Sequence, residues 1–300
     1  MPYLGEIASF FTAMCWSTNA VLFAKAGRRV GSSTVNVIRI GMALLVMVLL
    51  HLTLAGSLFP TSAGLARFVW LGLSGLIGFA LGDALLFEAY VLLGPRLTVL
   101  VFTTWPVFAA LMAWGLLGQS MGLLKVCAMV VTLGGIALVV LEKSRNHPDQ
   151  VRPRRFTLGL VLALGGAAGQ AVGFIFSKFG MAGGFSPISA NLIRVAAGAT
   201  ALWTWQILRG ELLPNFRKLK DTHAAMLIGL GALSGPVIGV VLSLYAINHA
   251  RYIGVASTIM SLSPVLILPF AVFVEKERVG FWAIVGTVVS IGGAAAMFLI

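Results

Sequence analysis

The chain contains ten apolar stretches of about 20 residues, separated by short charged or Pro/Gly-rich gaps. A helix needs about 20 mostly apolar residues to cross the hydrocarbon core of a bilayer. The expected spans are 4–23, 34–54, 68–92, 97–116, 123–141, 157–177, 187–208, 224–248, 253–274 and 280–299. The sequence therefore predicts an all-α integral membrane protein with ten transmembrane helices.

The composition supports a lipid environment and excludes other classes of protein. Apolar residues make up 59% of the chain and charged residues 10%, against about 45–50% and about 25% in soluble proteins. A water-soluble enzyme needs more polar surface, and a disordered chain needs more charge. Cys15 and Cys127 are too few for a disulfide scaffold and are expected to pack in the interior.

The net charge of +12 does not indicate a nucleic-acid partner, because the basic residues lie in gaps between apolar stretches. The expected spans place 15 Lys and Arg residues on one side of the membrane and four on the other. Basic loops stay cytoplasmic. We therefore expect the loop 142–156 inside and both termini outside, in a plasma membrane, with the bacterial inner membrane as the expected location.

Four groups of residues recur in the same order at separations of 155–158 residues. They are Asn36-Val37-Ile38-Arg39 with Asn191-Leu192-Ile193-Arg194, Gly78 and Gly82 with Gly235 and Gly239, Pro106-Val107 with Pro264-Val265, and Gly134-Gly135 with Gly292-Gly293. Such order at a nearly constant offset indicates an internal duplication. It predicts a first five-helix repeat over 1–142, a basic linker over 143–156 and a second repeat over 157–300.

Because each repeat has an odd number of spans, the second repeat must lie inverted in the membrane relative to the first. Inverted repeats are typical of secondary transporters, whose substrate sites lie near the membrane midplane between the repeats. The expected function is therefore transport of a small molecule by alternating access. A membrane channel and an intramembrane enzyme of rhomboid type are the alternatives.

Several segments resemble one transporter family. They are Leu262-Ser263-Pro264-Val265, Glu277-Arg278 followed by Gly286 and Gly292-Gly293, and Thr104-Trp105-Pro106-Val107. With the two repeats they resemble the drug/metabolite transporter superfamily, specifically its EamA-type ten-helix members. The resemblance implies an exporter of an amino acid, another metabolite or a drug, commonly proton-coupled, with no cofactor. Gln119 stands at the position that matches Glu277, which is a departure from the pattern.

The same resemblance implies cytoplasmic termini, which disagrees with the charge count. We keep the count, since it uses this chain's own residues. Ten helices suffice for a monomeric carrier, and a homodimer is the open alternative.

Asp83 and Glu88 are the acidic residues that fall inside a span, and both lie in span three. Ionisable groups inside a membrane usually face a cavity or a partner. As functional residues they would bind a proton or a cationic substrate. As structural residues they would form an ion pair with Arg39 or hydrogen bonds to a neighbouring helix. The matching positions in span eight, near Val240 and Tyr245, are not acidic.

The duplicated polar pairs have two interpretations. Asn36 and Arg39 share a helix face, and so do Asn191 and Arg194. The arginines would either hold a substrate carboxylate or cap neighbouring carbonyl groups. Duplication favours the structural role, because substrate contacts tend to diverge between repeats.

The remaining candidates would line a central cavity walled by spans one, three, four, six, eight and nine. Trp105 precedes Pro106, whose missing N–H interrupts a helix; Pro236 and Pro264 are expected to do the same. The complete set of predicted substrate-binding residues is Asp83, Glu88, Trp105, Asn19, Gln170, Tyr245 and Trp16. Plain core packing is an equal alternative for the aromatic residues.

Glycines recur at three- and four-residue spacing in spans three and eight, which lets helix backbones approach closely. They are Gly72, Gly75, Gly78, Gly82, Gly231, Gly235 and Gly239. The segment Gly72-Leu73-Ser74-Gly75 also fits the rhomboid pattern, but a catalytic serine needs a nearby histidine, and the histidines are predicted at interfaces or in a loop. We therefore expect packing glycines, no catalytic residue and no metal site.

Overall fold

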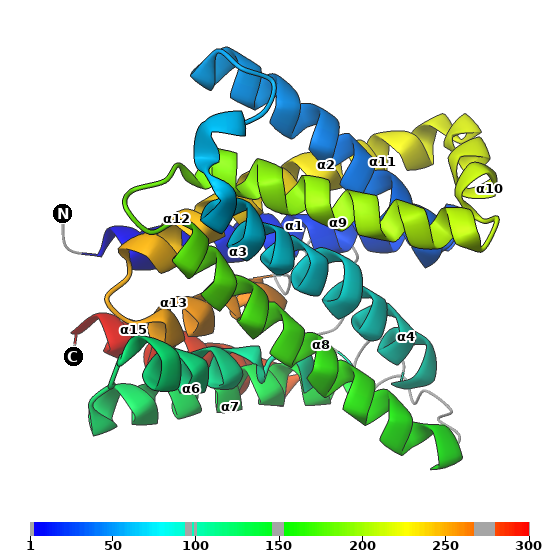
Figure 1. The fold of residues 1–300 in the computed structure, drawn as a ribbon. Coiled ribbons are helices and arrows are strands. Elements are labelled where there is room, and N and C mark those ends of the chain that lie inside the picture. Colours follow the sequence, from blue (N-terminus) through cyan, green and yellow to red (C-terminus); the bar gives the residue numbers. More distant parts are fainter. Residues whose placement is uncertain (1–2, 94–97, 99–100, 146–152, 267–279, 300) are drawn as a thin grey trace.

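The computed structural model describes residues 3–93, 98, 101–145, 153–266 and 280–299. These residues form helices joined by turns and loops, with no β-strand among them (Figure 1). Six of the described helices are long and apolar enough to cross a membrane, and three shorter apolar helices accompany them. Helical segments occur in all ten predicted spans, so the predicted all-α membrane class is confirmed.

The helices of the first repeat follow the predicted order. They are α1 (Leu4–Val30), α2 (Ser32–Ala55), α3 (Leu65–Gly75), α4 (Asp83–Leu93), α6 (Trp105–Leu117) and α7 (Leu123–Arg145), with a short 3-10 turn at Thr61–Ala63. Those of the second repeat are α8 (Pro153–Gly180), α9 (Pro187–Leu208), α10 (Leu212–Arg217), α11 (Thr222–Ala232), α12 (Val240–His249), α13 (Ile253–Met260) and α15 (Phe281–Leu299). A 3-10 turn at Lys218–Lys220 follows α10.

The first helix is longer than its apolar stretch. It was expected to end near residue 23, but it continues to Val30 and stops at Gly31, whose φ of 90° suits glycine. Arg28 and Arg29 lie in its last turn, where positive charge interacts favourably with the helix dipole. Apolar length therefore predicted the apolar part of the helix and missed the basic turns that extend it.

Spans three and eight contain π-helical turns at matching positions. The turn η2 covers Leu76–Gly82, and η4 covers Leu233–Gly239, which begins 157 residues later. Pro236 lies inside η4, as expected for an interrupted helix. The first-repeat turn contains no proline, so proline alone does not cause the irregularity. π turns are rare and often occur at functional sites.

Spans four and nine are both broken next to the predicted prolines. The helix of span four is interrupted by a turn at residues 103–104, immediately before Trp105 and Pro106. Span nine is interrupted at residues 261–262, shortly before Pro264. Discontinuous helices of this kind are a recurring feature of transporters.

The packing of α7 on α15 shows that the repeats are inverted. A side chain at Gly135 would overlap the backbone of Ser290, and one at Gly293 would overlap Thr132. Gly135 and Gly293 are equivalent positions of the two repeats, 158 residues apart, and so are Thr132 and Ser290. Exchanging the two repeats therefore turns the first contact into the second. Between these two contacts the residue number rises from 132 to 135 along α7, whereas it falls from 293 to 290 along α15. Equivalent helices of the two repeats are therefore antiparallel.

Most of the predicted glycine rows lie where helices meet. In span eight, a side chain added at Gly231 or Gly235 would overlap Phe23 or Asn19 of α1, and one at Gly239 would be in tight contact with Trp16. In span three, Gly78 and Gly82 lie beside Gly173 and Gly169 of α8, but a side chain added at Gly78 would face Arg194 of α9 at ordinary contact distance. Gly72 is the exception, because an added side chain there would meet nothing within 4 Å.

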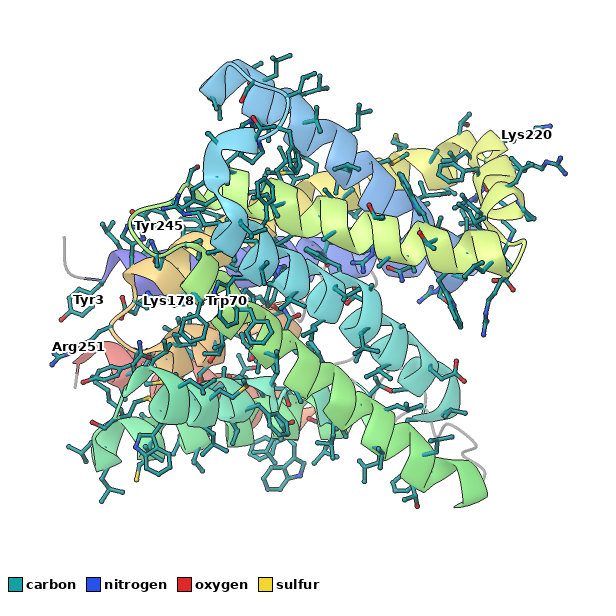
Figure 2. All side chains as sticks on the ribbon, viewed as in Figure 1. Tyr3, Trp70, Lys178, Lys220, Tyr245 and Arg251 are labelled. Carbon is teal, nitrogen blue, oxygen red and sulfur yellow. The ribbon has the colours of Figure 1, made fainter. Side chains whose placement is uncertain are left out.

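Both termini lie at the same end of the helix bundle, as an even number of crossings requires (Figure 1). Lys178 and Arg251 lie at that end, whereas Lys220 lies at the opposite end (Figure 2). This arrangement agrees with the sides to which the charge count assigned these residues. Which end faces the cytoplasm stays a prediction.

Candidate functional site

Arg39 and Asp83 form an ion pair between α2 and the start of α4. The Arg39 Nη2 atom binds Asp83 Oδ2, and Arg39 Nε donates a hydrogen bond of 2.9 Å to Asn36 Oδ1. The two charged side chains are 13% and 20% exposed. The structural interpretation of Asp83 as a partner of Arg39 is therefore observed.

Arg194 occupies a different environment, although its sequence motif is the same. The residue is 4% exposed, and its Nε and Nη1 atoms are buried with no hydrogen-bond partner in the described part of the chain. Its guanidinium carbon lies 5.2 Å from the Phe79 ring centroid and 5.6 Å from that of Phe174. The Asp83 carboxylate is near enough to attract it electrostatically. Aromatic faces thus pack against this cation, and the Asp83 carboxylate attracts it from beyond ion-pair distance.

Asn191 supports the π turn of span eight. Its Nδ2 atom donates a hydrogen bond of 2.8 Å to the Pro236 carbonyl oxygen. A π turn disrupts the regular helical pairing of carbonyl groups, so this bond satisfies a backbone acceptor inside the protein. The Asn36–Arg39 hydrogen bond is therefore not repeated as an Asn191–Arg194 bond.

Three aromatic residues from different helices meet beside the break in span four. The ring centroids of Trp105 and Phe174 are 5.4 Å apart, and Trp16 lies 6.3 Å from Trp105 and 6.4 Å from Phe174. Trp105 and Phe174 are buried. Phe174 was not among the predicted residues, although it lies one turn after Gln170 on α8. It connects the aromatic group to Arg194.

The two predicted amides have different surroundings. Asn19 is half-buried and packs against Gly235, where a larger residue would overlap its amide. Gln170 is half-buried on the same face of α8 as Phe174, because residues four apart lie one above the other on a helix. Asn19 therefore joins α1 to span eight, and Gln170 lies next to the aromatic group.

Tyr245 and Glu88 lie outside this group. Tyr245 stacks on His249, with ring centroids 3.9 Å apart, near the bundle end that carries the termini (Figure 2). Beside it, Lys178 Nζ donates hydrogen bonds of 2.8 Å to the Ile247 and Asn248 carbonyls at the end of α12. The Glu88 side chain is exposed on α4. Tyr245 packs against the edge of the hydrophobic core that contains Trp105 and Phe174, but no ring pairing with either residue occurs among the described residues.

Ser74 takes part in helix packing. Its hydroxyl group bonds to the Gly173 carbonyl and lies 2.8 Å from the Ser177 hydroxyl on α8. The His51 ring instead lies 3.0 Å from the Ser189 hydroxyl. The rhomboid-like segment thus forms part of the contact between α3 and α8.

Gln119, the departure from the family pattern, has a clear structural role. Its side-chain oxygen accepts a hydrogen bond of 3.0 Å from the Ile253 N–H. This bond satisfies a free donor in the first turn of α13. Glu277, the counterpart of Gln119 in the second repeat, lies outside the described residues.

An apolar cavity of about 360 Å³ lies beside the break in span four. It is lined by Val101, Thr103 and Thr104 of the broken helix together with side chains of α7 and α8. None of the predicted substrate-binding residues lines this cavity.

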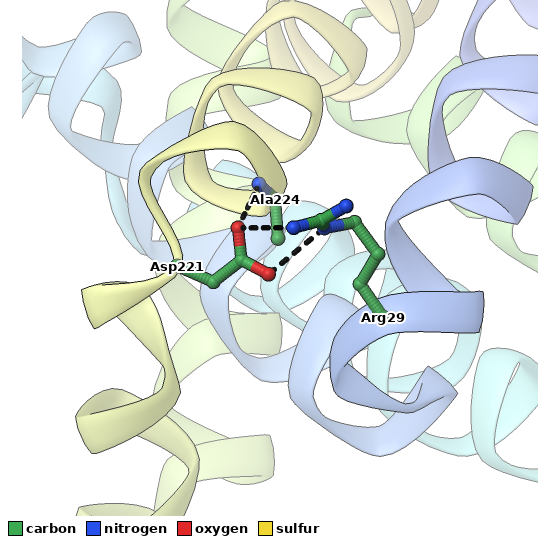
Figure 3. A network of polar contacts seen from close by, with 3 residues as sticks. All are labelled: Arg29, Asp221 and Ala224. Carbon is green, nitrogen blue, oxygen red and sulfur yellow. Dashed lines mark hydrogen bonds and ion pairs between the residues drawn. The ribbon is translucent and has the colours of Figure 1, made fainter.

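Polar contacts join the repeats at both ends of the bundle. At one end, Arg29 Nε and Asp221 Oδ2 are 2.8 Å apart, and the Ala224 N–H donates to Asp221 at 3.0 Å (Figure 3). The hydrogen bonds from Arg29 and from Ala224 lower the pKa of Asp221 below its ordinary value. At the other end, Arg67 Nη2 donates to the Ala182 carbonyl at 3.2 Å.

The inverted repeats, the paired π turns and the two broken helices define a membrane transporter fold. The comparisons agree, because residues 3–141 and 157–299 each match the EamA-like transporter family. The chain belongs to this family, whose members are transporters rather than enzymes.

A solved structure, described only as the crystal structure of a protein, is also similar to this chain. It has 19% sequence identity and a TM-score of 0.73, over 98% of this chain and 97% of its own length. This similarity shows a shared fold. No curated protein matches the chain.

Proposed function

We propose that the protein is a secondary carrier that exports a small metabolite, amino acid or drug by alternating access. The reciprocal packing of two inverted repeats is the observation that carries this proposal. Two halves with similar packing can exchange conformations, so one site opens to either side in turn. The breaks in spans four and nine provide matching points at which the helices can bend.

The proposed substrate site is the central cluster, which we define as Trp16, Trp105, Phe174, Asp83 and Arg194. Its aromatic rings come from three helices and lie next to the broken span four. Its charged groups come from both repeats. A substrate bound there would contact both repeats and would be sensitive to their relative motion.

Proton coupling is assigned to Asp83. Protonation would neutralise the carboxylate and remove its ion pair with Arg39, which joins α2 to α4. Proton binding and the movement of these helices would then be linked, because each changes the free energy of the other.

A counterflow experiment tests the carrier mechanism. Purified protein is first screened with amino acids, amines and drugs for ligands that raise its melting temperature. The best ligand is then loaded into proteoliposomes, and uptake of labelled ligand is followed. A carrier shows accelerated exchange, whereas a channel shows none.

Matched acidic variants test the coupling. Asp83→Asn is expected to abolish uptake driven by a pH gradient while keeping exchange. Glu88→Gln should behave as the wild type, because Glu88 is exposed outside the central cluster. Unchanged pH-driven uptake in Asp83→Asn would contradict the assignment.

Orientation in the membrane is a separate expectation. The charge count places both termini outside a bacterial inner membrane. A reporter fused to the C-terminus would be active only outside, and activity in the cytoplasm would reverse the orientation.

A further inference from the structure

Arg194 carries hydrogen-bond donors that the described residues of the protein do not satisfy. Its Nε and Nη1 atoms are buried, and no acceptor in the described residues reaches them. A buried cation without acceptors is costly in a membrane protein, so such residues usually serve a transported ligand or an ion pathway. Arg39, which has the same motif, bonds to Asn36 and Asp83.

Among the described residues, the charges around Arg194 do not balance. Arg39 and Arg194 contribute two positive charges, while the carboxylate of Asp83 is bound to Arg39 and contributes one negative charge. The second repeat has Val240 where the first has Asp83, so duplication supplies no second acid. One further negative charge at Arg194 would neutralise the group. A carboxylate is well suited, because it accepts two parallel hydrogen bonds from a guanidinium.

The surroundings of Arg194 favour an anion that carries an apolar body. Phe79 and Phe174 lie against the guanidinium, and Phe174 continues into the rings of Trp105 and Trp16. Next to Nη2 stands Gly78, where an added Cβ would lie 3.6 Å from this nitrogen. A glycine at this point keeps the space beside the guanidinium free of side chain.

From these observations we infer that Arg194 binds the carboxylate of an organic anion or zwitterion whose apolar body packs against Phe174 and Trp105. This inference rests on the proposed carrier function and narrows its substrate class.

Paired ligands test the inference on the purified full-length protein. The probes are phenylacetate, indole-3-acetate and octanoate, each compared with its uncharged amide at constant chloride concentration. At least one carboxylate is expected to raise the melting temperature in a concentration-dependent manner, and its amide is not. If no carboxylate stabilises the protein more than its amide, the inference is wrong.

Three variants locate the binding site. Arg194→Gln and Gly78→Ala are expected to weaken binding of the stabilising carboxylate at least tenfold. Gly78→Ala adds a methyl group at ordinary contact distance, so the fold should be kept. Gly72→Ala, on the same span with open space around it, is the matched control and should bind as the wild type does. Unchanged carboxylate binding in Gly78→Ala or in Arg194→Gln overturns the assignment. If Arg194→Gln does not fold, the binding measured with Gly78→Ala decides the test.

The outcome also separates this inference from the carrier proposal. Counterflow of a neutral or cationic substrate, without any carboxylate binding, would reject the anion site and retain the carrier. Carboxylate binding that depends on Arg194, without counterflow, would retain the site and reject the carrier.

Discussion

The two Asn-x-x-Arg motifs have the same spacing but different contacts. In the first repeat, Arg39 is half-buried and bonds to Asn36 and Asp83. In the second repeat, Arg194 is fully enclosed and lies against aromatic rings, while Asn191 bonds to a carbonyl of the π turn. Duplication of a motif therefore does not duplicate its role.

The residue on the facing helix accounts for part of this difference. A side chain at Gly75 would overlap the backbone of Arg194, so glycine allows α9 to pack directly against α3. The equivalent position in span eight is Ala232, 157 residues later. The methyl group of Ala232 keeps the backbone of the facing helix at a greater distance than Gly75 does. The absence of a Cβ at Gly75 therefore lets α9 come close enough to α3 to enclose Arg194.

A second difference concerns the broken helices. In the first repeat, Phe174 packs against Trp105 at the break of span four. At the equivalent place in the second repeat, Ser17 Oγ donates a hydrogen bond of 2.9 Å to the Ser263 carbonyl. One repeat is joined by ring packing and the other by a polar contact.

The largest expected effect comes from the ring contact. Phe174→Ala should lower the free energy of unfolding by about 3–5 kcal/mol, because it leaves a cavity at a buried site. Ser17→Ala should cost only about 1 kcal/mol for its lost hydrogen bond. Unfolding in mixed detergent measures both values. Equal losses would show that the two breaks are held with equal strength.

The next effect tests the close approach of α3 and α9. Gly75→Ala should destabilise the protein by about 2–3 kcal/mol, because the new methyl group forces two backbones apart. Ala232→Gly is the reciprocal variant and should cost about 1 kcal/mol through helix propensity alone. A Gly75→Ala protein as stable as the wild type would remove the steric explanation for the buried Arg194.

A smaller effect is expected from the shared carboxylate. Asp83→Asn should cost about 2 kcal/mol and more than Arg39→Gln, because it leaves two arginines without their anion. The double variant should recover part of this loss, which a double-mutant cycle measures. A larger loss for Arg39→Gln would mean that Asp83 serves Arg39 alone.

The smallest effect distinguishes the two ends of the bundle by pH. Asp221 has a lowered pKa in the folded state, so its bond to Arg29 stabilises the protein above the unfolded pKa of about 4. This stabilisation is lost as pH falls through the lower folded pKa. The Arg67 bond to a carbonyl has no titrating acceptor and should be insensitive in the same range.

Melting temperatures recorded from pH 6 to pH 3 check this prediction. Asp221→Asn should flatten the acid part of the curve, whereas Arg67→Gln should shift the whole curve without changing its shape. A curve for Asp221→Asn that is parallel to the wild type would contradict the role of this ion pair.

Ten membrane spans, the duplication and the helix breaks near Pro106 and Pro264 could be predicted from the sequence. The bilayer sets the length of each apolar stretch locally, and proline acts on its own turn, so these features need no knowledge of neighbouring helices. The sequence also offers the ion pair of Asp83 with Arg39 as one of two interpretations, because few charges occur within the spans.

Only the tertiary structure decided that the donors of Arg39 find acceptors while Nε and Nη1 of Arg194 find none among the described residues. Gly75 and Arg194 are far apart in the chain, and their contact depends on how α3 and α9 pack. The contact of Phe174 with Trp105 and Arg194 is equally non-local. Hydrophobic length is a property of one segment, whereas the satisfaction of a buried N–H depends on the partner that a distant helix brings to it.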